Sequence, residues 1–218
     1  IYKTVAPEGF FSLQQSDGSV SNSYYGIVPY SLKEIHFLND PCRMALSFCS
    51  MIEKVTIPEN ATSIGANAFR GCTSLRDFVM PESITQIGGY AFNQTAIQSI
   101  TIPKNVKFDV YDQYIFGECR ELRDVTYLSQ STCCPSGIFY GCTSLTELTL
   151  PNTVTTIGSS IIAGTAIQEF TVPKGVTVIS SNAFADCTQL VSITLPNNIT
   201  VIEYYAFLGC ASLKQINI

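Results

Sequence analysis

The sequence has few charged residues and a single histidine, His36. Of its 218 residues, 13% are charged, and the net charge is −5. No run of basic residues is present, which argues against nucleic acid or an anionic membrane surface as a partner. No apolar stretch reaches about 18 residues, the length at which a transmembrane helix is expected. The composition therefore predicts no membrane-spanning segment and no nucleic-acid partner.

Residue patterns that carry catalysis or hold a cofactor are also missing. There is no glycine-rich phosphate loop and no Gly-x-Ser-x-Gly nucleophile motif. One histidine gives no Cys₂His₂ zinc site, and the cysteines do not form Cys-x-x-Cys pairs. Asp109 and Asp112 could offer two carboxylates to a cation, but no further oxygen ligands lie nearby in the sequence. We therefore expect no enzyme activity, no cofactor and no metal.

What the sequence has instead is a repeat marked by proline. One proline recurs at the same place in the repeat, at Pro58, Pro81, Pro103, Pro151, Pro173 and Pro196, with intervals of 23, 22, 48, 22 and 23 residues. The long interval holds one repeat in which Leu128 takes the place of proline. A fixed period in this range is typical of a solenoid, in which each coil packs only on its neighbours.

Each repeat begins with a short segment that predicts a strand. In residues 145–150 and their equivalents, apolar residues occupy positions one, four and six around an exposed fifth position. Proline then ends the strand, because it cannot donate to the ladder. Nine such segments begin near Leu32, Ile52, Leu75, Ile97, Leu122, Leu145, Ile167, Leu190 and Leu213. No segment shows ten residues of helical periodicity, so we expect a mostly β solenoid of about nine coils. It would have a parallel sheet on one face and short strands or irregular turns on the other.

The chain divides into a lead-in and a repeat domain. Residues 1–22 do not fit the repeat and are expected to cap the first coil. Residues 23–218 form the repeat domain, with irregular coils near 38–51 and 104–140. The sequence ends on a predicted strand at Ile218, so that edge could pair with another strand. We expect phenylalanines such as Phe92, Phe184 and Phe207 to lie in the core.

The nine cysteines predict a buried column rather than a disulfide scaffold. Six share one repeat position: Cys49, Cys72, Cys119, Cys142, Cys187 and Cys210. Stacked side chains point the same way, which disfavours disulfide geometry, and small thiols suit a core. Cys134 replaces a buried isoleucine of the repeat, and Cys133 takes the exposed place beside it. Cys133 is therefore the thiol to examine for reactivity, although a structural role is the simpler interpretation.

The pattern LxxIxIPxxVxxIGxxAFxGCxxL, carried by most of residues 32–218, resembles the BspA-like (Treponema-type) leucine-rich repeat. The resemblance implies a right-handed leucine-rich-repeat solenoid on an extracellular or cell-surface protein. It also implies adhesion to host matrix, plasma or cell-surface proteins. Local departures from the pattern are the two irregular regions and Leu128 in place of proline.

The outward-facing strand positions give the candidate binding residues. The fifth position is mostly threonine, and the second and third positions vary between coils. Threonine is common on solvated strands, so this row can also be purely structural. The candidates are Thr101, Arg123, Asp124, Thr126, Glu147, Thr149, Glu169 and Thr171, with Tyr111 and Tyr114 of the insertion after Pro103 as possible exposed contacts.

Two functions remain open from the sequence. The first is a non-enzymatic, adhesin-like protein that engages a protein partner through the exposed strand face. The alternative is a structural spacer that presents another domain. Binding to ice or carbohydrate by the threonine rows is disfavoured, because His36, Val79 and Lys107 interrupt them.

Overall fold

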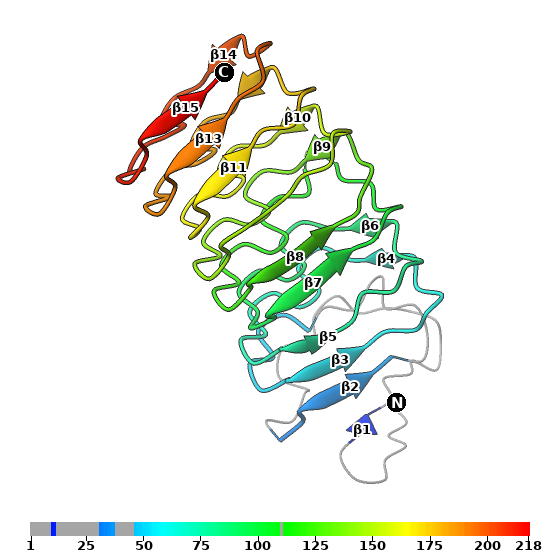
Figure 1. The fold of residues 1–218 in the computed structure, drawn as a ribbon. Coiled ribbons are helices and arrows are strands. Elements are labelled where there is room, and N and C mark those ends of the chain that lie inside the picture. The colour runs from blue at the N-terminus through cyan, green and yellow to red at the C-terminus, as the bar shows by residue number, and fades with distance from the viewer. Residues whose placement is uncertain (1–9, 12–30, 38–45, 110) are drawn as a thin grey trace.

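The computed structural model describes residues 10–11, 31–37, 46–109 and 111–218. In these ranges the chain forms short strands and turns and no helix, as the sequence predicts. The coils stack along one axis into an elongated solenoid (Figure 1). Within the described residues, no helix has the length and apolar character needed to cross a membrane. The predicted cap at 1–22 and the irregular coil at 38–51 lie largely outside these ranges, as does Cys42.

One side of the solenoid, here called the front face, carries the first strand of each coil. Its strands are β1 (Phe10–Phe11), β2 (Glu34–His36), β3 (Lys54–Thr56), β5 (Asp77–Phe78), β7 (Ser99–Ile102), β8 (Asp124–Tyr127), β11 (Glu169–Thr171), β13 (Ser192–Thr194) and β15 (Gln215–Asn217). All neighbouring pairs are parallel, with repeat-equivalent residues opposite one another, as in Phe170↔Ile193↔Ile216. Of the nine predicted front segments, only residues 145–150 are not a strand.

The opposite side carries two-residue strands in place of helices. These are β4 (Ser63–Ile64), β6 (Gln86–Ile87), β9 (Cys133–Cys134), β10 (Thr156–Ile157), β12 (Val178–Ile179) and β14 (Val201–Ile202). They pair in parallel as β4–β6, β9–β10 and β12–β14. Cys134 is buried opposite Ile157 in the β9–β10 pair, so it does replace the repeat isoleucine.

The core between the two sides is built from phenylalanines at one repeat position, with Ile162 at that position in the coil between Phe139 and Phe184. The rings of Phe92 and Phe116 lie 5.3 Å apart at 12°, and those of Phe116 and Phe139 lie 5.8 Å apart at 12°. These three side chains and Phe184 are fully buried. Phe207 is only partly buried. It lies in the last described coil, where only the preceding coil packs against it. For Phe207, the prediction of a core position holds only in part.

The cysteine column forms as predicted, and all eight cysteines in the described residues are free thiols. Five of the six column thiols donate to a carbonyl of the preceding coil, as in Cys119 Sγ to Phe92 O at 3.0 Å and Cys142 Sγ to Phe116 O at 3.2 Å. Thr95 and Thr165 fill the column where cysteine is missing, and their hydroxyls lie 3.2 and 3.6 Å from Cys119 and Cys187 Sγ. The buried cysteines of the column therefore link neighbouring coils through backbone acceptors.

The front sheet is not continuous, which the repeat pattern alone does not predict. It separates into β1-β2-β3-β5, β7-β8 and β11-β13-β15. We call the interruption between β5 and β7 the first break, and the one between residues 145–150 and β11 the second break. We call the turn that leads from the cysteine position of a coil into its front strand the corner. The corners before β7 and β11 are each one residue short. They read Thr-Ala-Ile at Thr95 and Thr165, where other coils have Cys-x-x-Leu or Cys-x-x-Ile.

After a short corner, backbone pairing and burial of the apolar side chains require different registers of the following strand. At full-length corners Arg76 N donates to Glu53 O, but at the second break Ala166 N donates to Leu145 O. The donor and the accepting carbonyl occupy equivalent repeat positions at a full-length corner, but their positions differ by one residue at the second break. Pairing in that register would turn every side chain of β11 to the other face, whereas Ile167 and Phe170 are buried. The core keeps the side chains inward, and the two segments remain unpaired. The side facing β8 follows a full-length corner, so the short corner does not account for the loss of pairing there.

Candidate functional site

The predicted binding residues of the front strands all lie exposed on the front face. Thr101 is on β7, and Arg123, Asp124 and Thr126 flank or form β8; the remainder are Glu147, Thr149, Glu169 and Thr171. The structure therefore brings these eight residues onto one surface that extends across the second break. Parallel pairing of β7 with β8 places Thr101 beside Thr126, whereas Glu147 and Thr149 lie on a segment that is not part of a sheet.

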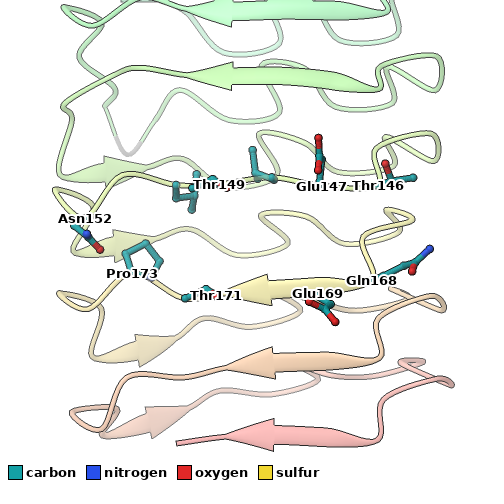
Figure 2. Close-up of a pocket in the computed structure, with 10 residues that line it drawn as sticks. Thr146, Glu147, Thr149, Asn152, Gln168, Glu169, Thr171 and Pro173 are labelled. Carbon is teal, nitrogen blue, oxygen red and sulfur yellow. The ribbon is translucent and has the colours of Figure 1, made fainter.

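A groove opens at the second break, between residues 146–150 and the β11 segment. It encloses about 640 Å³ and is lined by Thr146, Glu147, Leu148, Thr149, Leu150, Asn152, Gln168, Glu169, Thr171 and Pro173. Figure 2 shows these two segments as the borders of the groove, with Glu147 on one border and Glu169 on the other. Four of the predicted binding residues line it.

The borders of the groove carry backbone groups without protein partners. No inter-coil backbone hydrogen bond involves residues 146–150, and Ala166 N to Leu145 O, at 3.0 Å, is the last such bond before the groove opens. On β11, Gln168 O and Val172 N bond toward β13. Alternate residues of a parallel strand bond to opposite neighbours, so Glu169 and Thr171 direct their amides and carbonyls into the groove.

The first break also follows a short corner and leaves β5 and β7 unpaired, but side chains bridge it. Glu121 Oε1 lies 2.7 Å from Arg76 Nη2, and its Oε2 accepts from Gln98 Nε2 at 3.1 Å. The hydrogen bonds from Arg76 and Gln98 hold the pKa of the Glu121 carboxyl below its usual value. These three residues span the break.

The equivalent positions at the second break are Thr146, Gln168 and Gln189. They retain the glutamine but lack both the arginine and the glutamate. In the described residues no side-chain hydrogen bond or ion pair joins the three. The second break is therefore open where the first is clamped.

Charge is also distributed unevenly along the third position of the front strands. In the first coils the signs alternate, and Lys54 forms an ion pair with Asp77 at 2.9 Å. Three successive coils then carry Asp124, Glu147 and Glu169, and none of these carboxylates has an ion-pair partner among the described residues. Like charges on adjacent strands are destabilising, so this acidic row opposes closure of the sheet at the groove.

Comparisons with known proteins identify the repeat. The model of the BspA-type leucine-rich repeat region matches residues 42–161 and 109–218, with six copies. The chain belongs to this family. A leucine-rich repeat protein from Bacteroides ovatus is 25% identical, with a TM-score of 0.64 over 87% of this chain and 53% of that one. This BspA-type chain thus spans about half the length of that protein. No curated protein matches it.

Two further solved structures share the fold of the BspA-type chain. The T. pallidum leucine-rich repeat protein TpLRR is 24% identical, with a TM-score of 0.53 over 94% of this chain and 78% of that one. The pneumococcal vaccine antigen PcpA is 15% identical, with a TM-score of 0.55 over 98% of this chain and 67% of that one. At these identities the likeness concerns the fold alone.

The two candidate tyrosines of the insertion do not form one exposed site with the front face. Tyr111 is 82% exposed, whereas Tyr114 is half-buried in a row of rings. It stacks on Tyr90 at 5.4 Å and meets Tyr140 edge-on at 5.6 Å. Partial burial, then the neighbouring Tyr90 and Tyr140, raise the pKa of Tyr114. For Tyr114, packing within the solenoid thus replaces the expected exposure.

The remaining sequence candidates in the BspA-type fold have structural roles. Asp112 Oδ2 accepts from the Asp109 amide at 2.8 Å, and Asp109 Oδ1 accepts from the Tyr111 amide, so these carboxylates brace the insertion. Within the described residues, no three potential metal ligands cluster. Cys133 is half-buried, and burial followed by Asp109 and Asp112 raises the pKa of its thiol. A raised pKa lowers its thiolate fraction at neutral pH, which opposes reactivity.

Sequence reasoning found four of the ten residues that line the groove but missed the groove itself. The signal was present in the corners, where Thr165-Ala166-Ile167 is one residue shorter than Cys142-Thr143-Ser144-Leu145. Reading corner length together with the apolar pattern would have located both breaks.

Proposed function

We propose that this chain is a non-enzymatic, adhesin-like binding protein of the cell surface or extracellular space. Its exposed front face would engage a protein partner. The observation that carries the proposal is the polar, exposed surface over β7, β8 and β11, which contains the groove and the acidic row. Membership of a leucine-rich-repeat family supports a protein-binding role.

The front face has the properties that a recognition surface needs. Its scaffold has one continuous buried core, in which Phe92, Phe116 and Phe139 stack from coil to coil. Its second and third strand positions differ from coil to coil, as in Arg123-Asp124 and Gln168-Glu169. Specific protein interfaces cover on the order of 800 Å² per partner, an area that an extended sheet face can offer without a deep pocket.

The second threonine row does not need a binding role. Thr85 Oγ1 donates to Thr62 O at 3.1 Å, and Thr200 Oγ1 donates to Thr177 O at 3.1 Å. These hydroxyls extend the backbone ladder between coils. Because these hydroxyls have a structural role, the proposed binding surface is the front face alone.

Binding of the purified chain to immobilised matrix and plasma proteins, fibronectin and fibrinogen among them, tests this proposal. We expect a saturable interaction at physiological salt. The variant Arg123→Ala/Thr126→Ala/Glu147→Ala should weaken it by more than the matched variant Thr62→Ala/Thr85→Ala/Thr177→Ala. Equal weakening would refute the assignment to the front face, and no binding across the panel would favour the spacer function.

A further inference from the structure

Resting on the proposed function, we propose that the groove at the second break binds an extended, basic segment of a protein partner. The segment would lie along residues 146–150 and β11 as an added strand. Its backbone would bond to the free amides and carbonyls, and its lysine or arginine side chains would meet the acidic row.

The first argument concerns the backbone. Glu169 and Thr171 direct their backbone groups into the groove, and residues 146–150 form no inter-coil backbone hydrogen bonds. A row of unpaired amides and carbonyls is a template for pairing with another extended chain, and strand addition is a recurrent mode of peptide recognition. In this protein the template faces solvent between two coils rather than at the end of the sheet.

The second argument concerns charge. The residues that line the groove include Glu147 and Glu169 and no lysine or arginine. Asp124 extends the same row on β8, and none of the three carboxylates is ion-paired in the described residues. A segment with basic side chains would relieve the repulsion within the row, whereas an acidic segment would add to it.

The third argument is the contrast with the first break. There, Arg76, Gln98 and Glu121 bridge two strands that are also unpaired after a short corner. The second break keeps the glutamine, as Gln168, but has Thr146 and Gln189 in place of the two charged residues. The first break therefore serves as an internal comparison. Substituting Thr146 and Gln189 would give the second break the bridging residues of the first.

The test uses three short synthetic peptides: one alternating threonine and lysine, one alternating threonine and glutamate, and the lysine peptide with N-methylated backbone amides. The measurement is titration of the isotope-labelled full chain by NMR, with amide exchange recorded in the free and bound states. The lysine peptide should shift the resonances of Glu169 and Thr171 saturably and slow their amide exchange by about tenfold or more. The glutamate and N-methylated peptides should bind at least about tenfold more weakly, a ratio worth about 1.4 kcal/mol.

The variant Thr146→Arg/Gln189→Glu should lower affinity for the lysine peptide by about tenfold while leaving the chain folded. The matched variant Arg76→Thr/Glu121→Gln should leave affinity at the second break unchanged. Equal binding of the N-methylated peptide would mean attraction by charge alone and would overturn the inference. Unaltered affinity in the clamped variant would overturn it as well.

Failure of this inference differs from failure of the proposed function. If the clamped variant still binds a matrix or plasma protein as well as the wild type, the front face binds proteins but not through the groove. If the lysine peptide binds as predicted and no protein of the panel does, the inference about the groove is retained and the adhesin-like role loses its support.

Discussion

Restoring the missing corner residue should rejoin the sheet at the second break. The change is insertion of one serine between Thr165 and Ala166, which returns the corner to the four-residue spacing of Cys142-Thr143-Ser144-Leu145. The register conflict then disappears, because the strand can pair in step while Phe170 stays in the core. Residues 146–150 would pair with β11 as β13 pairs with β15.

The magnitude follows from a normal junction. Between β13 and β15, three of the inter-coil backbone hydrogen bonds lie outside the strand ladder itself: Lys214 N and Gln215 N to Val191 O, and Leu195 N to Asn217 O. At about 1 kcal/mol net per bond, a similar set at the second break gains about 3 kcal/mol. Ordering one more residue removes about 1–2 kcal/mol, and Glu147 opposite Glu169 removes about 0.5 kcal/mol. The ladder bonds within the newly paired strands add to this sum, so we expect the free energy of unfolding to rise by at least about 1 kcal/mol.

Two assays check this prediction. Urea unfolding followed by circular dichroism measures the change in stability, and amide exchange by NMR reports whether Glu169 and Thr171 become protected. A control insertion of serine between Thr143 and Ser144, in a corner of normal length, should be destabilising. If the amides of Glu169 and Thr171 exchange at unchanged rates in the Thr165 insertion variant, the short corner is not the cause of the break.

Three further predictions concern the core, a tight contact and the thiols. Phe116→Ala should lower the free energy of unfolding by about 3–5 kcal/mol, and Phe207→Ala by clearly less, in urea titrations; equal losses would contradict the burial difference. Gly137→Ala should destabilise by more than about 1 kcal/mol, because φ is +61° and the added Cβ would lie 2.4 Å from Tyr114 Cε1; a thermal melt at wild-type temperature would refute this. Burial raises the pKa of Cys72 from 9.0 to about 12, so above about pH 9 the unfolded chain loses a proton that the folded chain keeps. Stability should therefore be full below pH 9 and fall as pH rises toward 12, and native thiols should resist a thiol reagent until the chain unfolds.

The repeat pattern predicted those features of the fold that every coil shares. Buried positions such as Phe92 and Cys134 follow from alignment, because each coil meets the same neighbours. Side-chain identity at a repeat position was enough to place the cysteine column and the exposed row of Thr126 and Thr149. Such predictions need no knowledge of how one particular coil meets the next.

Features that depend on the difference between two coils were harder to predict. The breaks arise from corner length together with the fixed inward side of Ile167, and neither observation alone shows a conflict. Burial of Tyr114 depends on Gly137, which leaves room for its ring one coil further on. Tyr90 and Tyr114 also adopt φ of 60° and 51°, where Asn67 and Gly137 stand in neighbouring coils. Propensity disfavours this conformation for a bulky residue, but the turn of the repeat imposes it, since Tyr205 also has φ of 59° at the same position.

The two breaks show how a solenoid can acquire a binding site without a pocket. In a continuous sheet every front-face amide and carbonyl is used between coils, so only side chains remain for recognition. A corner that is one residue short releases the backbone groups of the junction that follows it, and the effect stays local because coils interact only with their neighbours. Whether the junction then closes depends on a few surface residues, as Arg76 and Glu121 show at the first break. The second break lacks that pair and carries the acidic row, so the same local defect becomes a surface with free hydrogen-bonding groups and a preferred sign of charge.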